Sequence, residues 1–176
     1  DTGEHATRVG KLSGDIARSL GIEESEAKLI ELAAALHDLG KIGIPDSILL
    51  KPGKLTEEEY AIMKTHTTIG SQVLRGTNST LLRLAQTIAL THHERWDGTG
   101  YPQGLKGEEI PLLSRILAVS DAYDAMTEKR LYRKPISKDA AVKEIVDNAG
   151  TQFDPEIVRI FVEEVLPEES GGMMTE

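Results

Sequence analysis

The sequence predicts an all-α fold, a single-domain bundle of roughly seven helices. Apolar residues recur mostly at helical spacing, and little of the chain alternates between apolar and polar residues as a strand does. The 176 residues suit one compact domain, and no repeat or internal boundary divides them. Because aromatic residues make up only 4% of the chain, leucine, isoleucine, valine and alanine must supply most of the core.

Helices are expected wherever the helical spacing persists, that is, from the start to about Leu20 and over about 25–36, 65–74, 81–93 and 111–126. Gly21 is the expected C-terminal stop of the first. Thr56 and Glu59 form a capping-box pattern, which predicts that another helix begins there. The segment 40–53 is interrupted by glycine and proline, so we expect an ordered loop.

The C-terminal third contains a loop signal and two helix caps. Three glycines and a proline in residues 97–104 predict a loop. Ser137 and the pair Asp154-Pro155 are typical caps for two closing helices, and the apolar residues of the last are expected in the core. Residues 167–176 show no periodicity and predict a flexible tail.

The charge balance excludes several classes of function. Twenty Lys and Arg residues against 29 Asp and Glu give a net charge of −9, so binding of a nucleic-acid polymer through a basic surface is not expected. An anionic substrate would instead need a local cationic site, such as a bound metal. The absence of cysteine excludes thiolate zinc sites and disulfides, and a reducing cytosol fits this composition.

The ends and the hydropathy of the chain give two further expectations. No apolar run approaches the length of a membrane-spanning helix, so this fragment is not expected to insert into a membrane. The chain starts on Asp1, without a methionine, and enters an amphipathic segment at once. We therefore expect a fragment of a longer protein, with a regulatory domain upstream.

Histidines and carboxylates are grouped in a way that indicates metal. His37-Asp38 ends an apolar helix, where an unpaired buried carboxylate would be costly and a metal ion would satisfy it. His92 and His93 end another apolar stretch. Adjacent helical residues point about 100° apart, so we expect this pair to give one imidazole to each of two neighbouring ions.

Two further positions fit the same interpretation. Asp121 lies in a largely apolar helix with Asp124 three residues on, although an acid held by an arginine or a helix cap explains Asp121 equally well. Asp1 and His5 share a helical face at i, i+4. Imidazole and carboxylate ligands without cysteine suit Fe, Mn, Ni, Zn or Co. The sequence thus predicts a site for at least two metal ions, assembled from several helices.

Two strings carry a resemblance to a known family. His37-Asp-Leu-Gly-Lys41 is followed by the longer His92-His-Glu-Arg-Trp-Asp-Gly-Thr-Gly-Tyr-Pro102. His-Asp alone is a weak signal, whereas the long string at this distance is a strong one. Together they resemble the HD-GYP family, a subgroup of the HD phosphohydrolase superfamily, from Thr2 to about Glu164. The resemblance implies a bacterial, cytoplasmic, metal-dependent catalytic domain over residues 1–166, which hydrolyses cyclic di-GMP to pGpG and in some members onward to GMP.

The resemblance also implies roles for individual residues. The implied ligands of two or three divalent ions, iron or manganese first, are His5, His37, Asp38, His66, His92, His93 and Asp121. Asp38 would bridge two ions, and a hydroxide shared by them would attack the phosphodiester. Lys41 would hold the scissile phosphate or assist the leaving oxygen. The residues expected to face the substrate with Lys41 are Asp124, Arg130 and Arg133.

One position departs from the family pattern. Members with a third ion have glutamate four residues before the first motif histidine, and here that place holds Asp1, which is one methylene shorter. The third ion is therefore left open.

The loop of Gly100, Tyr101 and Pro102 fits a tight surface turn, but an exposed Tyr101 and Trp96 beside a metal pair favour a function. The resemblance implies that this loop faces the substrate or a partner, including GGDEF domains. Two alternatives stay open: an HD hydrolase for another nucleotide or cyclic dinucleotide, and a non-catalytic cyclic di-GMP signalling module. The Gly-Tyr-Pro segment disfavours the first, and the complete ligand set disfavours the second.

Overall fold

The computed structural model describes residues 2–76, 78–128 and 134–167, and it confirms the all-α prediction. Within these residues the chain forms nine α-helices, more than the roughly seven expected: α1 (Thr2–Ser19), α2 (Glu24–Ala34), α3 (Asp46–Leu49), α4 (Glu57–Lys64), α5 (His66–Val73), α6 (Thr80–Thr91), α7 (Leu112–Thr127), α8 (Lys138–Asp147) and α9 (Pro155–Ile160). Three further helical turns are η1 (Leu39–Gly43), η2 (Gly107–Glu109) and η3 (Phe161–Val165). Apart from Pro167, the predicted tail lies outside the described residues.

The segment 40–53 is not the irregular loop that its glycines and proline suggest. It contains most of the 3₁₀ turn η1 and the short helix α3. A Cβ atom on Gly40 would lie 1.8 Å from the backbone oxygen of His66, so glycine is needed for the close contact between η1 and α5. The glycine signal here marks two backbones in contact.

The predicted helix starts are confirmed. Thr56 caps α4: its hydroxyl oxygen accepts from the backbone N–H of Glu59. The Glu59 carboxylate accepts from the backbone N–H of Thr56, which completes a capping box. Ser137 caps α8, and Asp154 caps α9 with Pro155 in its first turn. Each cap satisfies an amide that the helix itself leaves unpaired, which stabilises a helix by about 1 kcal/mol.

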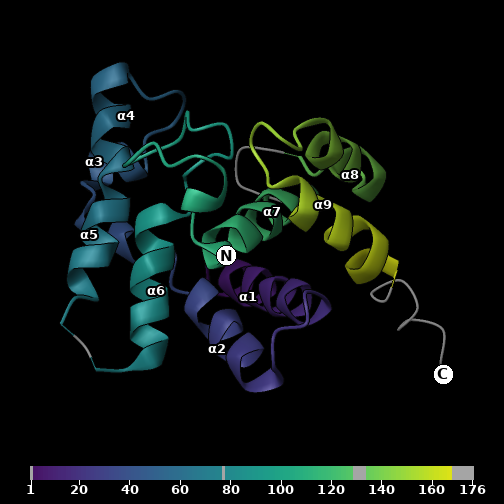
Figure 1. The fold of residues 1–176 in the computed structure, drawn as a ribbon. Coiled ribbons are helices and arrows are strands. Elements are labelled where there is room, and N and C mark those ends of the chain that lie inside the picture. Colours follow the sequence, from purple (N-terminus) through teal and green to yellow (C-terminus); the bar gives the residue numbers. More distant parts are fainter. Residues whose placement is uncertain (1, 77, 129–133, 168–176) are drawn as a thin grey trace.

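Helices α1 and α7 pack together in the middle of the bundle, with α2 and α6 on one side and α8 and α9 on the other (Figure 1). One apolar cluster fills the space between α1, α7, α8 and α9, and it contains the expected core residues Ile157, Ile160 and Phe161. A second cluster joins α1, α2 and α6 through Val9, Ile88 and their neighbours. Apolar burial on both sides therefore fixes the central pair, α1 and α7, relative to the helices around it.

The α5–α6 pair lies at one end of the bundle, and η1 packs against α5 (Figure 1). This packing brings the chain after α2, the start of α5 and the end of α6 toward α1 and α7. Among the described helices, none combines the length and the apolar composition needed to cross a bilayer.

Candidate metal centre

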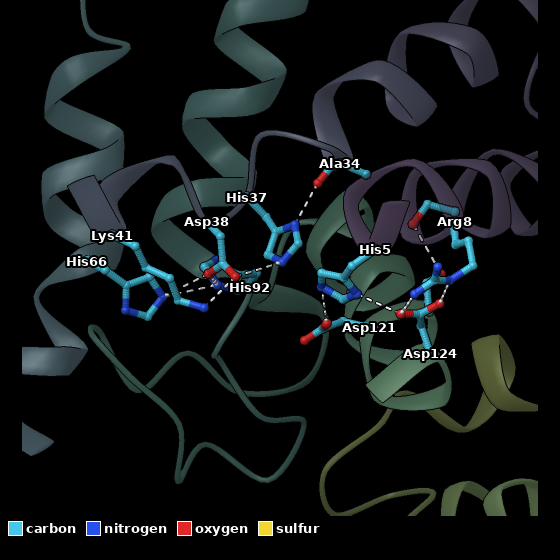
Figure 2. A network of polar contacts seen from close by, with 12 residues as sticks. His5, Arg8, Ala34, His37, Asp38, Lys41, His66, His92, Asp121 and Asp124 are labelled. Carbon is cyan, nitrogen blue, oxygen red and sulfur yellow. Dashed lines mark hydrogen bonds and ion pairs between the residues drawn. The ribbon is translucent and has the colours of Figure 1, made fainter. Parts of the chain in front are cut away.

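All five histidines of the chain converge at the place where α1, α5, α6 and α7 meet the turn after α2. Figure 2 shows four of them: His5, His37, His66 and His92. They form two groups of metal-ligand type, and the ligand atoms within each group lie within 4.8 Å of one another: His66, His92 and His93 in the first group, and His5, His37 and Asp121 in the second. Both groups match the chemistry of imidazole and carboxylate metal sites.

The histidines are oriented by the backbone. Nδ1 of His37 donates to the carbonyl of Ala34 at 2.8 Å, and Nδ1 of His66 donates to that of Met63 at 2.7 Å. Nδ1 of His92 lies 3.0 Å from the carbonyl of Ile88. Because a carbonyl only accepts, Nδ1 of each of these rings carries a proton, and Nε2 is the nitrogen left for a metal ion. In the first group Nε2 of His66 and of His92 are 3.3 Å apart, so the donor set fits a metal ion.

Asp38 lies between the two groups (Figure 2). Its Oδ2 is 3.4 Å from Nε2 of His37, a member of the second group. Its Oδ1 is 3.6 Å from Nε2 of His66 and 3.8 Å from Nε2 of His92, both in the first group. One carboxylate therefore presents one oxygen to each group, which is the arrangement that a bridging ligand requires.

The electrostatics of the two groups differ. Burial, and then the neighbouring His66, lower the pKa of His93 to about 4, and burial also lowers the pKa of His66 and of His92. These imidazoles are neutral at pH 7. In the second group, hydrogen bonds to Asp121 and Asp124 raise the pKa of His5 to about 9. That shift reflects a negative potential that attracts a cation.

The expectation that His92 and His93 serve different ions is wrong for this geometry. Both belong to the first group with His66, and their ring centroids are 4.1 Å apart. Helix α6 ends at Thr91, so the 100° separation of helical neighbours no longer applies to the turn that follows. The bridging group between the two clusters is the Asp38 carboxylate.

Lys41 follows one turn after Asp38, and its Nζ donates to Oδ2 of Asp38 at 2.5 Å. The Lys41 side chain is 41% exposed, so the ammonium group reaches both the candidate centre and solvent. Three predicted residues, Asp1, Arg130 and Arg133, lie outside the described residues.

A family model described as HD domain matches residues 2–157. The chain belongs to the HD domain family. A cyclic di-GMP phosphodiesterase of Thermotoga maritima is 53% identical to this HD domain over 162 residues, 92% of this chain and 44% of that protein. A 3'3'-cGAMP-specific phosphodiesterase 2 of Vibrio cholerae is 43% identical over 163 residues, 93% of this chain and 31% of that protein. The chain thus spans less than half the length of either relative.

A solved structure of an HDG"Y"P protein from Bdellovibrio bacteriovorus has a TM-score of 0.72 to this HD domain, at 22% identity. The likeness covers 94% of this chain and 52% of that one, and at this identity it is a likeness of fold. Together with the family match and the curated relatives, it confirms the predicted resemblance to HD-GYP phosphodiesterases.

Asp124 takes a different place in the HD domain from the substrate contact expected of it. It is buried, its Oδ2 accepts from Nδ1 of His5 at 2.6 Å, and its Oδ1 accepts from Nε of Arg8 at 2.5 Å. The opposite nitrogen of His5, Nε2, is 3.4 Å from Asp121 (Figure 2). Asp124 therefore orients the His5 ring toward Asp121. Sequence reasoning missed Arg8, although its i+3 spacing places it on the same helical face as His5.

Replacing Asp124 with alanine is expected to weaken metal binding about 10- to 100-fold, because His5 loses the acceptor that fixes its ring and its tautomer. Calorimetric titration of the metal-free protein with Mn²⁺ measures this directly. Asp124→Asn keeps one acceptor oxygen and should recover part of the affinity. Asp139, an exposed carboxylate on α8, supplies the control Asp139→Ala. Unchanged affinity in Asp124→Ala would exclude the positioning role.

The Gly-Tyr-Pro loop packs against the first group. The Tyr101 ring stacks on His93 with centroids 4.8 Å apart, and the Tyr60 ring of α4 meets Tyr101 edge-on with centroids 6.5 Å apart. A Cβ atom on Gly100 would lie 2.4 Å from the backbone nitrogen of Arg95, so the loop folds back tightly on itself. The expectation that Tyr101 and Trp96 are exposed is wrong, because both are partly buried: Tyr101 packs on His93, and the Arg115 guanidinium lies 5.9 Å from the centroid of the Trp96 ring.

Glu94 holds this loop and was not singled out from the sequence. It is buried, and its two carboxylate oxygens accept from the backbone amides of Gln103 and Leu105 at 2.8 and 3.0 Å. An acid directly after the histidine pair is the only sequence signal for this role.

Glu94→Ala should lower the free energy of unfolding by about 2–4 kcal/mol, since two amides lose a charged acceptor. Urea denaturation followed by circular dichroism measures the loss. Exposed Glu108 provides the matched control, and Glu108→Ala should change stability by less than about 0.5 kcal/mol. Equal stability of the two variants would contradict the role of Glu94 in holding the loop.

Proposed function

We propose that the chain is a phosphodiesterase that hydrolyses cyclic di-GMP. The observation that carries the proposal is the position of Asp38, with one oxygen toward each of two three-residue ligand groups. Such a pair of sites suits the attack of water on a phosphodiester. Without a catalyst this attack is slow, because neutral water is a weak nucleophile and the negative charge of the phosphodiester repels an incoming oxygen. The names of the relatives support a cyclic dinucleotide as the substrate.

The residues that would hold two divalent ions, iron or manganese first, are His5, His37, Asp38 and Asp121 for one, and Asp38, His66, His92 and His93 for the other. When bound, such ions lower the pKa of water and neutralise the phosphate oxygens. Backbone carbonyls hold Nδ1 of His37, His66 and His92, and Asp124 holds Nδ1 of His5, so Nε2 is the nitrogen of each ring that would face an ion.

Lys41 acts on the substrate in this scheme. Its ammonium group is near Asp38 and partly exposed, so it can face a phosphodiester that lies over the ligand groups. As water adds to phosphorus and the bond to the ribose 3′-oxygen breaks, negative charge grows on the oxygens around phosphorus. Lys41 stabilises that charge, and the product is the linear dinucleotide pGpG with a 5′-phosphate.

The test is an anaerobic purification, followed by metal analysis and by chromatography of the products formed from cyclic di-GMP with added Mn²⁺ or Fe²⁺. We expect two ions per chain and the appearance of pGpG, with GMP appearing later if the linear product is cut again. Three ions would bring Asp1 into the ligand set. Metal without turnover of cyclic di-GMP would refute the assignment of the substrate, and absence of metal under every loading would favour a non-catalytic module.

A second candidate substrate is 3'3'-cGAMP. The relative from Vibrio cholerae that carries this name is 43% identical to the chain. Turnover of equal concentrations of the two cyclic dinucleotides in one reaction gives the ratio of their kcat/KM values. We expect cyclic di-GMP to be consumed first, and preferential consumption of 3'3'-cGAMP would reassign the specificity.

The Gly-Tyr-Pro loop is the proposed contact for a GGDEF domain, within a longer protein that carries an upstream regulatory domain. Pro102 is exposed whereas Tyr101 packs on His93, so Pro102 offers the accessible surface. Pro102→Glu should abolish capture of a purified GGDEF domain and leave hydrolysis within about twofold of wild type. Retained capture would exclude the loop as the contact.

A further inference from the structure

The cavity beside the candidate metal centre has a volume of about 330 Å³. Its lining includes His92, His93 and Asp121 of the two ligand groups, and it extends along α7 to Ala122 and across to Gln152. Small-molecule sites usually measure about 300–1,000 Å³, so this cavity is near the lower limit. It suits the reacting phosphodiester and one nucleoside better than a whole cyclic dinucleotide.

A second cavity of about 370 Å³ adjoins it, between α7, the segment before α8, the second half of α8 and the loop before α9. Ala122 and Gln152 line both cavities. The remaining lining residues of the second cavity are Ala125, Met126, Ile136, Glu144, Asn148 and Phe153. The two cavities therefore meet at the methyl group of Ala122 and the side chain of Gln152.

The second cavity has the chemistry of a purine site. Phe153 and Met126 are buried and supply apolar walls, which suit the flat faces of a base. Glu144 and Asn148 place polar groups at its edge, with Nδ2 of Asn148 3.3 Å from Oε1 of Glu144. The side-chain amide of Gln152 has no hydrogen-bond partner among the described residues, so it is available to a ligand.

We propose that the second cavity binds one guanine base of the cyclic dinucleotide while the scissile phosphodiester lies at the ligand groups. Guanine carries two donors side by side, its N1–H and its amino group, and both can donate to the carboxylate of Glu144. Adenine has an acceptor in place of the N1–H, so the same carboxylate disfavours it. The inference rests on the proposed function, and it makes Glu144 a specificity-determining residue.

Two variants test the site with three substrates: cyclic di-GMP, cyclic di-AMP and bis(p-nitrophenyl) phosphate, a phosphodiester without a base. Ala125→Leu fills the second cavity without lining the first. It should raise KM for cyclic di-GMP about tenfold and leave hydrolysis of the base-free substrate within about twofold. Ala140→Leu, on the exposed face of α8, is the matched control.

Glu144→Gln is the second variant, and it retains the fold because Glu144 is exposed and glutamine has nearly the same shape. It should reduce the preference for cyclic di-GMP over cyclic di-AMP about tenfold. Unchanged KM and unchanged preference in both variants would overturn the base site and leave the proposed function intact. A wild-type protein that cleaves bis(p-nitrophenyl) phosphate but no cyclic dinucleotide would refute the proposed function, and the base site with it.

Discussion

Asp38→Ala is expected to reduce turnover of cyclic di-GMP by at least about 10³-fold, and to lower the metal content of the purified protein as well. Asp38 places one oxygen 3.4 Å from His37 and the other 3.6 Å from His66, so its removal takes a ligand from both groups at once. His37→Ala removes one ligand from one group and should also abolish turnover. Metal analysis and product chromatography on the same samples give both quantities.

Asp139→Ala is the matched control for this loss, because Asp139 is an exposed carboxylate on α8, away from the ligand groups. It should keep wild-type turnover and metal content. Retention of full activity by Asp38→Ala would contradict the two-metal scheme. Circular dichroism of each variant separates loss of metal from loss of fold.

Lys41→Ala is expected to lower kcat by about 10²–10³-fold while the metal content stays at the wild-type level. The Lys41 ammonium donates to Asp38, is partly exposed and belongs to neither ligand group, so it stabilises charge on the substrate without holding the ions. The two variants therefore differ in a measurable way. Asp38→Ala loses metal and activity together, and Lys41→Ala loses activity alone.

Lys41→Arg tests whether charge alone is sufficient. Arginine keeps the positive charge in a larger planar group, and we expect it to recover only part of the lost kcat. Lys51→Ala, which breaks an ion pair with Glu59, is the control for loss of a lysine elsewhere. A Lys41→Ala protein with wild-type kcat would exclude Lys41 from the reaction.

Local signals in the sequence were sufficient for much of the fold. Thr56 with Glu59, and Asp154 with Pro155, cap helices through contacts between near neighbours, so their spacing alone identifies them. The segment 40–53 could not be predicted in this way. Its first turn, η1, packs on α5 through the contact of Gly40 with His66, a residue far along the chain.

The candidate site likewise has a part that the sequence predicts and a part that depends on how the helices pack. The residue types that form the two ligand groups follow from chemistry and from the family resemblance, and the structure brings them together. The grouping of His92 and His93 could not be predicted, because it depends on where α6 ends. Asp124 contacts residues more than 100 positions away in the sequence: it is 119 positions from His5 and 116 from Arg8. These contacts form only because α1 packs on α7.

The most direct test of the central claim is anomalous X-ray diffraction from crystals of the wild-type protein loaded with Mn²⁺. We expect two anomalous peaks, one beside each oxygen of Asp38, with His5, His37 and Asp121 around one and His66, His92 and His93 around the other. A single peak, or two peaks that do not share Asp38, would contradict the bridging carboxylate on which the proposed reaction depends.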